Sequence, residues 1–371
     1  MTKKILQKIF KRISYSLFAL IYGKIVKSIN FDSDSRINTQ IIKKNSNLTY
    51  KVYAIKNGRL YTDRIQDTAI LIDNFIISGP SFQYRKNVNS SAKLNIVFTK
   101  GTPRKLKKIS GKVLSLLTGG AGNDNYWHWL YDVLPRLALC DEVVKLNNID
   151  YFLVPSIKIK FQHETLTTLG IPSKKFLSSE KYRHIQADEL LVTDHPYALS
   201  DDPSKDIHNI PKWIHLWLKE RFLNNYNHYL FKKDLPKKIY IDRGDSISNI
   251  ARLRTIINES EIKNLLDKNG FTSIRLSNLQ FLEQVKLFNR ADYIVGLHGA
   301  AFANMVFCKP KTKVLELKNN TIADRVIESL AMTNNLNFSS IVCEQIGSNF
   351  SNQLGHIKVP LNILENKIKN L

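Results

Sequence analysis

The stretch Ala291–Leu317, ADYIVGLHGAAFANMVFCKPKTKVLEL, decides the fold of the C-terminal half. Its apolar run Tyr293–Leu297 predicts a buried strand, and Lys313–Leu317 predicts a second one. Between them, Ala300–Phe307 is small and apolar enough for a packed helix, which Lys309-Pro310-Lys311 would end. A strand–helix–strand order of this length is typical of a parallel sheet, in which ligands bind beyond the carboxyl ends of the strands.

The turn between the first of these strands and the helix is a candidate diphosphate site. His298 and Gly299 would place an imidazole and backbone N–H groups at a helix N-terminus, where anions are stabilised. Glu316, near the end of the second strand, would reach a ribose hydroxyl. No GxGxxG or Walker pattern accompanies this turn, and a lone glycine after a strand is more often only a turn.

The rest of the C-terminal half repeats the alternation of strand and helix. After a linker expected at Asp234-Leu235-Pro236, the pattern predicts strands at Lys238–Ile241, Thr272–Leu276 and Phe338–Val342, and helices at Arg254–Lys268, Leu279–Asn289 and Ile322–Met332. This spacing predicts a Rossmann-like, doubly wound parallel sheet in residues 236–371.

The preceding residues, 31–235, have a mixed pattern that predicts an α/β lobe. Short β-rich segments between Asn47 and Lys100 come first, and another strand is expected at Lys112–Leu117. Further along, the sequence predicts a helix from Tyr126 to about Val144, a strand at Tyr151–Val154, a helix at His163–Leu169, a strand at Glu189–Val192 and a helix at Ile210–Tyr226.

Composition limits the functions that fit. The 371 residues suit two folded domains, and three cysteines without paired spacing, Cys140, Cys308 and Cys343, favour a reducing compartment. The net charge of +23 comes from lysines scattered along the chain, without any nucleic-acid-binding motif. We therefore expect no nucleic-acid partner, and expect the positive surface to attract phosphate donors or anionic headgroups instead.

Residues 1–30 predict a basic amphipathic helix. They hold seven Lys or Arg and no acidic residue, and their apolar side chains recur at helical spacing. Such a helix suits the surface of an anionic membrane, at the inner face of the cytoplasmic membrane, although packing on its own domain is the alternative. The apolar segment Ile13–Tyr22 is too short to span a bilayer.

A second candidate site is GGAGNDNYWHWLYDVLPRL, residues 119–137. Its glycines permit a tight loop, and Asp124 or Asn125 can cap the helix that follows. On that helix His128 and Asp132 stand four residues apart and share a face, as a general base and its partner would. Neighbouring aromatic side chains suit the apolar faces of sugars, although they equally fit a buried stripe.

Three blocks of this sequence resemble glycosyltransferase family 61, which includes bacterial capsular polysaccharide enzymes. They are NYWHWLYDVLPRL at 125–137, YIDR at 240–243 followed by RTIINE at 254–259, and IVGLHGAAFANMVF at 294–307 with Val314-Leu315-Glu316. The sequence departs from the family pattern at Asp242, where a small hydroxyl residue is expected, and at Ala301, where glycine is common. Residues 1–110 lie outside these blocks.

The resemblance implies a two-lobed GT-B fold and an inverting, metal-independent transfer of a hexose or pentose. The donor would be a nucleotide-sugar and the acceptor a glycan or a lipid-linked sugar, in the synthesis of a capsular or lipopolysaccharide-type surface polymer. Asp132 would be the general base with His128 beside it, and the reverse assignment is the alternative. The resemblance assigns donor binding to Arg243, Arg254, Asn258, Glu259, His298, Gly299, Ala300, Asn304 and Glu316, and acceptor binding to Asn125, Tyr126, Trp127 and Arg136.

Two other functions remain open on the sequence. A nucleotide-cofactor oxidoreductase would use the same parallel sheet, but it should show GxGxxG. A non-enzymatic basic module that binds membranes or nucleic acid would not need the His128–Asp132 pair. We expect no cofactor and no bound metal, because the DxD at Asp32-Ser33-Asp34 follows the basic helix and no third ligand accompanies His128 and Asp132.

Overall fold

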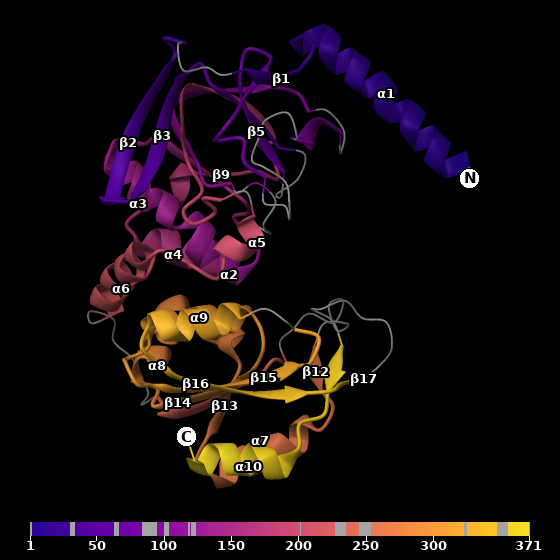
Figure 1. Ribbon diagram of the computed structural model, residues 1–371. Coiled ribbons are helices and arrows are strands. Elements are labelled where there is room, and N and C mark those ends of the chain that lie inside the picture. Colours follow the sequence, from indigo (N-terminus) through magenta and orange to yellow (C-terminus); the bar gives the residue numbers. More distant parts are fainter. Residues whose placement is uncertain are drawn as a thin grey trace. The chain divides into compact units, whose positions relative to one another are not determined.

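The chain forms two compact units, Met1–Ile214 and His215–Leu371 (Figure 1). The computed structural model describes residues 2–29, 34–62, 67–83, 95–99, 104–117, 119, 124–200, 202–226, 235–244, 254–322, 325–346 and 355–370. The division falls inside helix α6 (Lys212–Tyr226). The sequence placed the linker further along, at 234–236, of which residue 234 lies outside the described residues.

The first unit is built on a ten-stranded mixed sheet. Its strands are β1 (Val26–Ile29), β2 (Ile37–Asn45), β3 (Leu48–Lys56), β4 (Arg59–Thr62), β5 (Thr68–Ile72), β6 (Phe75–Ile77), β7 (Lys107–Ser115), β8 (Tyr151–Val154), β9 (Phe176–Ser178) and β10 (His184–Thr193). The main path is β1-β6-β5-β4-β10-β7-β8-β9, with β3 also paired to β10 and β2 to β3.

Strand β10 is the organising strand of this sheet. It runs antiparallel to β3 and β4 but parallel to β7, so it joins the meander of β2–β6 to the parallel strands β7, β8 and β9. Its apolar residues, such as Ile185 and Leu190, are fully buried in a core that they share with Val113 and Leu153. The mixed α/β character expected for this half is confirmed.

Helices of the first unit follow the strands in short pieces. They are α1 (Thr2–Tyr22), α2 (Tyr126–His128), a π-helical turn η3 (Trp129–Val133), α3 (Pro135–Asp141), α4 (Lys160–Thr168) and α5 (Pro203–Asp206), with 3-10 turns at Val97–Thr99, Leu146–Asn148 and Ser173–Lys175. The single helix expected from Tyr126 to Val144 is thus divided by the π turn and ends at Asp141. Within the described residues no helix is long and apolar enough to cross a bilayer.

The second unit contains a five-stranded parallel sheet in the order β13-β11-β14-β15-β16. Its elements are β11 (Lys238–Ile241), β12 (Thr255–Ile256), α7 (Glu259–Lys268), β13 (Thr272–Ile274), η7 (Leu276–Asn278), α8 (Phe281–Arg290), β14 (Tyr293–Leu297), η8 (Ala300–Phe307), β15 (Lys313–Asn319), α9 (Val326–Thr333), β16 (Asn337–Cys343), β17 (Gln345–Ile346), β18 (His356–Ile357) and α10 (Leu361–Asn370). Helices α8 and α9 cover one face of the sheet, and α7 and α10 cover the other (Figure 1).

The doubly wound parallel sheet expected for residues 236–371 is therefore confirmed, with two local corrections. Residues Arg254–Ile256 do not begin the helix: Thr255–Ile256 is strand β12, which pairs with β18, and α7 starts only at Glu259. The β-branched pair favours the strand, and Asn258 then occupies the N-cap position. The segment Ala300–Phe307 is a 3-10 helix rather than an α-helix.

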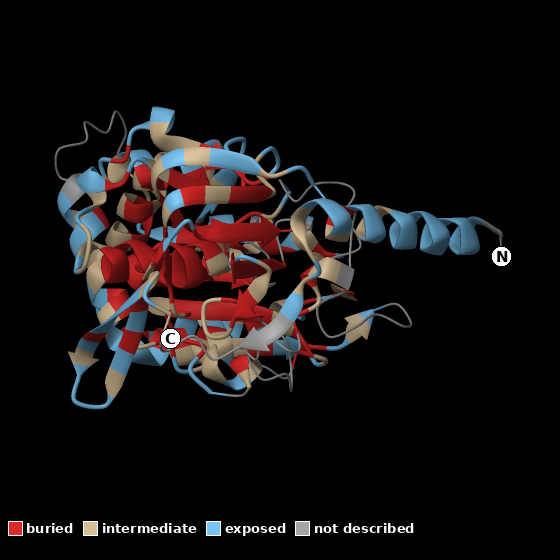
Figure 2. Ribbon diagram, turned by 90° about the horizontal axis from the view of Figure 1, so that it is seen from above, coloured by how far each residue is buried: buried red, intermediate tan, exposed pale blue. Residues whose placement is uncertain are grey.

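Helix α1 is far more exposed than the rest of the first unit. The strands of both sheets are mostly buried, whereas most of α1 is exposed (Figure 2). Only its C-terminal end enters the core, where Phe18 packs against Tyr61, Ala69 and Val97. The expected alternative, packing of this helix on its own domain, therefore holds for its C-terminal end, whereas its other large apolar side chains are exposed.

Candidate active site

In the first unit the site begins at the cap of α2. The Asn125 side chain accepts a hydrogen bond from the Trp127 N–H at 2.9 Å, which fixes where the helix starts. The π turn then follows, closed by the Leu134 N–H bonded to the Trp129 carbonyl at 3.0 Å. A π turn holds one residue more than an α turn and often occurs at functional sites. Here it carries His128 at its start and Asp132 within it.

His128 and Asp132 meet as the sequence predicts. His128 Nδ1 lies 3.0 Å from Asp132 Oδ2, and the Asp132 side chain is fully buried while the His128 side chain is 18% exposed. Of the two, His128 is the one that a substrate in solvent can reach. The other carboxylate oxygen, Oδ1, is buried without a hydrogen-bond partner among the described residues.

A second histidine, His195, bonds the same carboxylate oxygen, with Nε2 at 3.3 Å from Asp132 Oδ2. Its Nδ1 accepts hydrogen bonds from the backbone N–H groups of Tyr197 and Ala198, at 3.3 and 2.9 Å. Nδ1 is therefore unprotonated, and the ring proton sits on Nε2, from which it is donated to Asp132. His195 is held neutral and acts as a fixed donor to the carboxylate.

The charges of this cluster follow from burial and contact. Burial by itself raises the pKa of Asp132, but the two histidines outweigh it and hold that pKa well below its usual range. Burial lowers the pKa of His195, and it lowers the pKa of Arg136 to about 10. Asp132 is thus an ionised, inaccessible carboxylate. An ionised Asp132 accepts from His128 Nδ1–H, which leaves His128 Nε2 as the basic nitrogen.

The residues assigned to the acceptor are mostly engaged in the fold. Trp127 is 6% exposed and packs against Tyr131, with ring centroids 5.0 Å apart. Arg136 is 5% exposed and donates to the Asp132 and Thr193 carbonyls at 2.9 and 3.3 Å. Tyr126 is half-buried with its ring near Phe161. Of this set, Asn125 is exposed and Tyr126 is half-buried, so these two are the most accessible to an acceptor.

The glycine loop before α2 is described only in part. A Cβ at Gly119 would lie 1.6 Å from the Phe82 carbonyl oxygen, so no larger residue fits this close approach of two backbones. Gly120, Ala121 and Gly122 lie outside the described residues.

In the second unit, the candidate residues meet at the carboxyl ends of β11 and β14, beside the middle of β15. His298 follows β14, and its Nδ1 lies 2.5 Å from Glu316 Oε1, while the other carboxylate oxygen lies 3.8 Å from Lys318 Nζ. Arg243 follows β11, and its Nη1 donates to the His298 carbonyl at 3.1 Å. Both oxygens of the 2%-exposed Glu316 are engaged inside the unit. Glu316 is thus a hydrogen-bond partner of His298, and its expected contact with a ribose stays a prediction.

Beside Arg243 there is a cavity of about 140 Å³. It is lined by Tyr240, Arg243, Gly244, Arg254, Thr255, Ile256, Glu259 and Leu297. Two guanidinium groups therefore face one small space at the strand ends, together with the Glu259 carboxylate that accepts from the Tyr240 hydroxyl at 3.1 Å. Paired arginines at such a place suit an anionic phosphate group.

The turn after β11 is held by Asp242. Its Oδ1 accepts from the Gly244 N–H at 2.7 Å, and its Oδ2 contacts Arg275 Nε at 3.0 Å and Lys263 Nζ at 3.1 Å. Burial raises the pKa of Asp242, but the Gly244 N–H and the two cations outweigh it and lower the pKa overall. Asp242, one of the two residues that differ from the family pattern, thus fixes the turn that carries Arg243.

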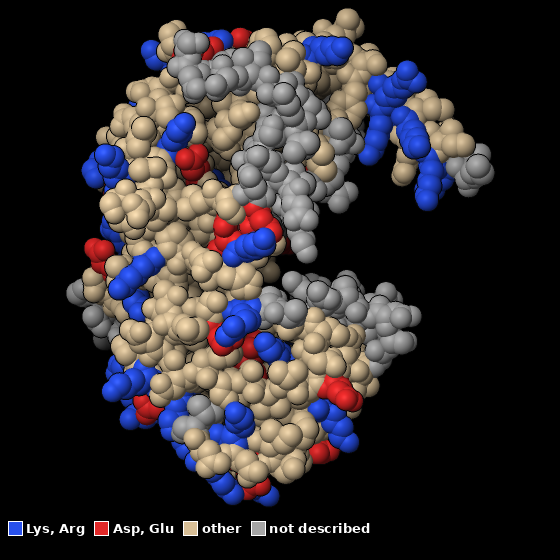
Figure 3. Space-filling view, viewed as in Figure 1, with Lys and Arg blue, Asp and Glu red and all other residues tan. Residues whose placement is uncertain are grey.

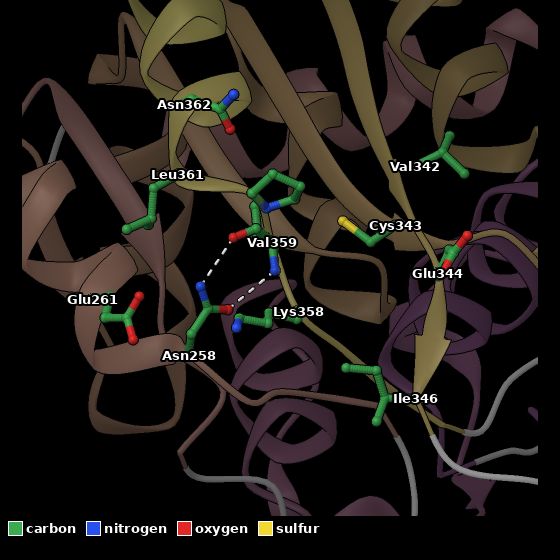
Figure 4. A pocket seen from close by; sticks show the side chains of 11 residues that line it. Asn258, Glu261, Val342, Cys343, Glu344, Ile346, Lys358, Val359, Leu361 and Asn362 are labelled. Atoms are coloured by element: carbon green, nitrogen blue, oxygen red, sulfur yellow. Dashed lines mark hydrogen bonds between the residues drawn. The ribbon is translucent and has the colours of Figure 1, made fainter.

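Two other residues that were expected to bind the donor, Asn258 and Asn304, form hydrogen bonds within the protein. The Asn258 amide donates to the Val359 carbonyl at 2.9 Å and accepts from the Val359 N–H at 3.0 Å, beside a cavity of about 690 Å³ (Figure 4). Asn304 is fully buried and donates to Gln284 and to the Ala301 carbonyl. Gly299 and Ala300 begin η8, and a Cβ at Gly299 would lie 3.2 Å from Arg243 Nη1.

Metal ligands do not gather in the described part of the chain, where no group of three His, Cys, Asp or Glu could hold an ion. Of the DxD sequence, Asp32 and Ser33 lie outside the described residues, and Asp34 bonds Arg36 at 2.8 Å. The three cysteines, Cys140, Cys308 and Cys343, are free and buried.

Sequence reasoning missed His195. It lies 63 residues from Asp132 in the chain, so no local spacing connects them. One signal was present: Asp194 and His195 directly follow the buried strand β10, and polar residues at the carboxyl end of a sheet strand mark candidate sites.

The molecule is thus an α/β protein with a histidine–carboxylate pair in each unit, one beside a neutral histidine and one beside cations. A model of the glycosyltransferase 61 family matches residues 126–315, just over half of the chain, and includes His128, Asp132, Arg243 and His298. The chain belongs to the glycosyltransferase 61 family.

Other comparisons add little to this assignment. No curated protein matches the chain. Among solved structures, the chain is similar to a mutant flavo di-iron protein from Thermotoga maritima, with 10% sequence identity over 90% of this chain and 98% of that one. The TM-score of 0.26 does not show a common fold.

Proposed function

We propose that the protein transfers a sugar from a nucleotide-sugar to a hydroxyl of a glycan or lipid-linked acceptor, with inversion at the anomeric carbon and without a metal. Family membership supports sugar transfer. The observation that carries the mechanism is the buried, ionised Asp132 bonded to the more exposed His128. The transferred sugar would be a hexose or a pentose, and the product a surface polysaccharide of the capsular or lipopolysaccharide type.

His128 is the general base of this reaction, with Asp132 as its orienting partner. His128 Nε2 takes the proton from the acceptor hydroxyl while that oxygen attacks the anomeric carbon. Ionised Asp132 holds the ring through Nδ1 and stabilises the imidazolium that forms, as the carboxylate of a catalytic triad does. This reverses the assignment favoured on sequence, because a fully buried carboxylate with a lowered pKa is a poor acceptor of a substrate proton.

The strand edge of the second unit binds the donor diphosphate. As the bond from the anomeric carbon to the phosphate oxygen breaks, that oxygen keeps the electron pair and the nucleoside diphosphate leaves with added negative charge. Arg243 and Arg254 line one cavity together with Leu297. His298 and the backbone N–H groups that begin η8 follow Leu297 in the sequence. Fixed cations and dipoles of this kind stabilise the leaving group without a metal.

Transfer requires both units to present their groups to the same pair of substrates, which is the two-lobed GT-B arrangement that the family resemblance implies. In this proposal residues 31–235 form the acceptor lobe and residues 236–371 the donor lobe. We place the reaction at the inner face of the cytoplasmic membrane, where nucleotide-sugars and lipid-linked acceptors meet. The exposed basic helix α1 supports that location.

A donor panel tests the proposal. Purified full-length protein is incubated with individual nucleotide-sugars, and release of nucleoside diphosphate is followed with and without a chelator. We expect slow hydrolysis of one donor class, insensitive to the chelator, and the opposite anomer in the released or transferred sugar by NMR. Hydrolysis of no donor, combined with binding of a dinucleotide cofactor, would assign the parallel sheet to the oxidoreductase alternative.

A further inference from the structure

Helix α1 presents a broad apolar surface that the fold leaves exposed. Eight large apolar side chains of this helix are between 51% and 84% exposed: Ile5, Leu6, Ile9, Phe10, Ile13, Leu17, Leu20 and Ile21. They are eight of the eighteen exposed large apolar side chains in the described part of the chain. Such a concentration within one helix marks an interaction surface rather than scattered exposure.

These side chains form one stripe on the helix. At about 100° per residue, the eight positions span roughly 160° of the circumference. Four basic residues, Lys4, Lys8, Lys11 and Arg12, fall on the remaining side by the same count. The helix is therefore divided lengthwise into an apolar half and a basic half.

The fold holds α1 by its basic side and only near its C-terminal end. Phe18 is 4% exposed and packs on Tyr61 and His184, with ring centroids 5.8 and 5.5 Å away. The Tyr22 hydroxyl accepts from the Leu106 N–H at 3.0 Å. By helical count both rings point away from the apolar stripe. The first unit thus fixes the helix while it turns the stripe outward.

The positive charge of α1 indicates which kind of surface its apolar stripe binds. The helix contains five Lys or Arg and no Asp or Glu, and none of the five forms an ion pair among the described residues. Basic side chains project along α1 in Figure 3. A surface of anionic lipids supplies both an apolar layer for the stripe and negative headgroups for these cations.

Two other occupants fit less well. A second copy of α1 would bring five unpaired positive charges against five more without any acid to offset them. Its stripe is also wider than the narrow seam of a two-helix coiled coil. A membrane-spanning position does not fit either, because α1 has 21 residues but is not apolar enough to cross a bilayer.

We infer that α1 lies in the plane of an anionic membrane surface, with its apolar stripe in the acyl boundary and its basic side at the headgroups. The packing of Phe18 and Tyr22 ties the first unit to that surface. This inference rests on α1 alone and does not depend on the transfer chemistry.

Vesicle flotation tests this inference with the full chain. Vesicles of phosphatidylcholine alone and with added phosphatidylglycerol are compared at about 0.15 M salt. We expect flotation with the anionic vesicles, and a partition coefficient at least about tenfold lower for the double variant Ile13→Asp and Leu17→Asp. The triple variant Lys4→Gln, Lys8→Gln and Lys11→Gln should lose roughly a hundredfold on anionic vesicles.

Met332→Asp is the matched control, because Met332 is an exposed apolar side chain of α9 in the second unit, and it should float as the wild type does. Donor hydrolysis should remain unchanged in every variant, so a failure of the transfer proposal would be seen separately. The inference is overturned if the stripe variant floats like the wild type. It is equally overturned if ultracentrifugation shows a dimer that the stripe variant abolishes while no form binds vesicles.

Discussion

Each unit of this protein bonds a histidine through Nδ1 to a carboxylate that is almost fully buried, but the two pairs have different neighbours. In the first unit the carboxylate of Asp132 also takes a hydrogen bond from neutral His195. In the second, Glu316 has the cation Lys318 at 3.8 Å, and Arg243 donates to the backbone of His298.

The neighbours decide what each pair can do. In the first pair, His128 Nδ1 lies 3.0 Å from the buried Asp132 carboxylate, which orients the ring and would stabilise the imidazolium that proton transfer forms. In the second pair, His298 also contacts a carboxylate, Glu316, but Lys318 lies 3.8 Å from that carboxylate and Arg243 donates to the His298 carbonyl, so cations that attract an anion lie near this pair. We therefore expect the first pair to act on a proton and the second to bind phosphate.

The largest effect is expected from His128→Ala. Turnover should fall by about 10²–10⁴, because the proton acceptor is lost, while the affinity for the donor stays the same. Steady-state kinetics and calorimetry measure the two quantities. His163→Ala is the control, since His163 is an exposed histidine of the same unit that bonds Ser173. Wild-type turnover in the His128 variant would remove the proton-transfer role from the first pair.

Asp132→Asn distinguishes the two assignments of the base. If Asp132 orients His128, turnover should fall by about 10²–10⁴ but by less than in His128→Ala measured beside it, because asparagine still hydrogen-bonds but stabilises the imidazolium poorly. Added imidazole should then partly restore His128→Ala. A loss in Asp132→Asn that equals or exceeds the His128 loss, without imidazole rescue, would return the base to Asp132.

Arg243→Ala should act on binding rather than on turnover. Loss of one charge-assisted bond to the diphosphate should weaken nucleotide binding by about 1.5–3 kcal/mol, measured by calorimetry. Arg325→Ala in the same unit is the control, because Arg325 is an exposed arginine paired with Glu328. Unchanged affinity for every tested nucleotide diphosphate would contradict the anion-binding role of the second pair.

The smallest effect is expected from His195→Asn, with about a tenfold loss in turnover and no change in donor binding. Its second readout is stability. Burial lowers the pKa of His195, so below pH 6.5 or so the unfolded chain binds a proton that the folded chain does not. The free energy of unfolding therefore falls as the pH drops from about 6.5 toward the lowered pKa. In the His195→Asn variant, the share of this pH dependence that His195 contributes should be absent.

His184→Asn separates the two readouts of that experiment. His184 is a buried histidine at the start of β10, the strand that His195 follows, and burial lowers its pKa to about 4. Its variant should flatten the pH dependence of thermal unfolding between about pH 6.5 and 4 but keep full turnover. Equal losses of turnover in the two variants would mean that His195 only maintains the fold.

Periodicity predicted much of the fold because the decisive segments are buried on both faces. Tyr293–Leu297 and residues 239–241 are continuous apolar runs in the middle of a parallel sheet, and the strands that hold them, Tyr293–Leu297 and Lys238–Ile241, have the expected bounds. Prediction failed where pairing partners are distant. Strand β12 exists because Thr255 and Ile256 pair with residues 356 and 357, about a hundred positions later, which no local pattern reveals.

The sites show the same division between local and distant information. The His128–Asp132 contact follows from helical spacing and was predicted. The contact between Glu316 and His298 was not predicted, because it joins a residue of β15 to the residue that follows the neighbouring strand β14. The third member of the first cluster, His195, could not be connected from sequence because sheet pairing, not spacing, brings β10 beside the helix.

The π turn at Trp129–Val133 makes this part of the chain sensitive to length more than to composition. Removing one residue between His128 and Asp132 would reduce their separation to three and rotate the preceding turn by about 100°. Residues three apart still share a helix face, but the imidazole would move by about 100° around the helix axis relative to the carboxylate, so the present contact between His128 Nδ1 and Asp132 Oδ2 would be lost. A chimaera that exchanges this segment must therefore keep the number of residues from Asn125 to Pro135, whereas apolar replacements at single positions can be accommodated.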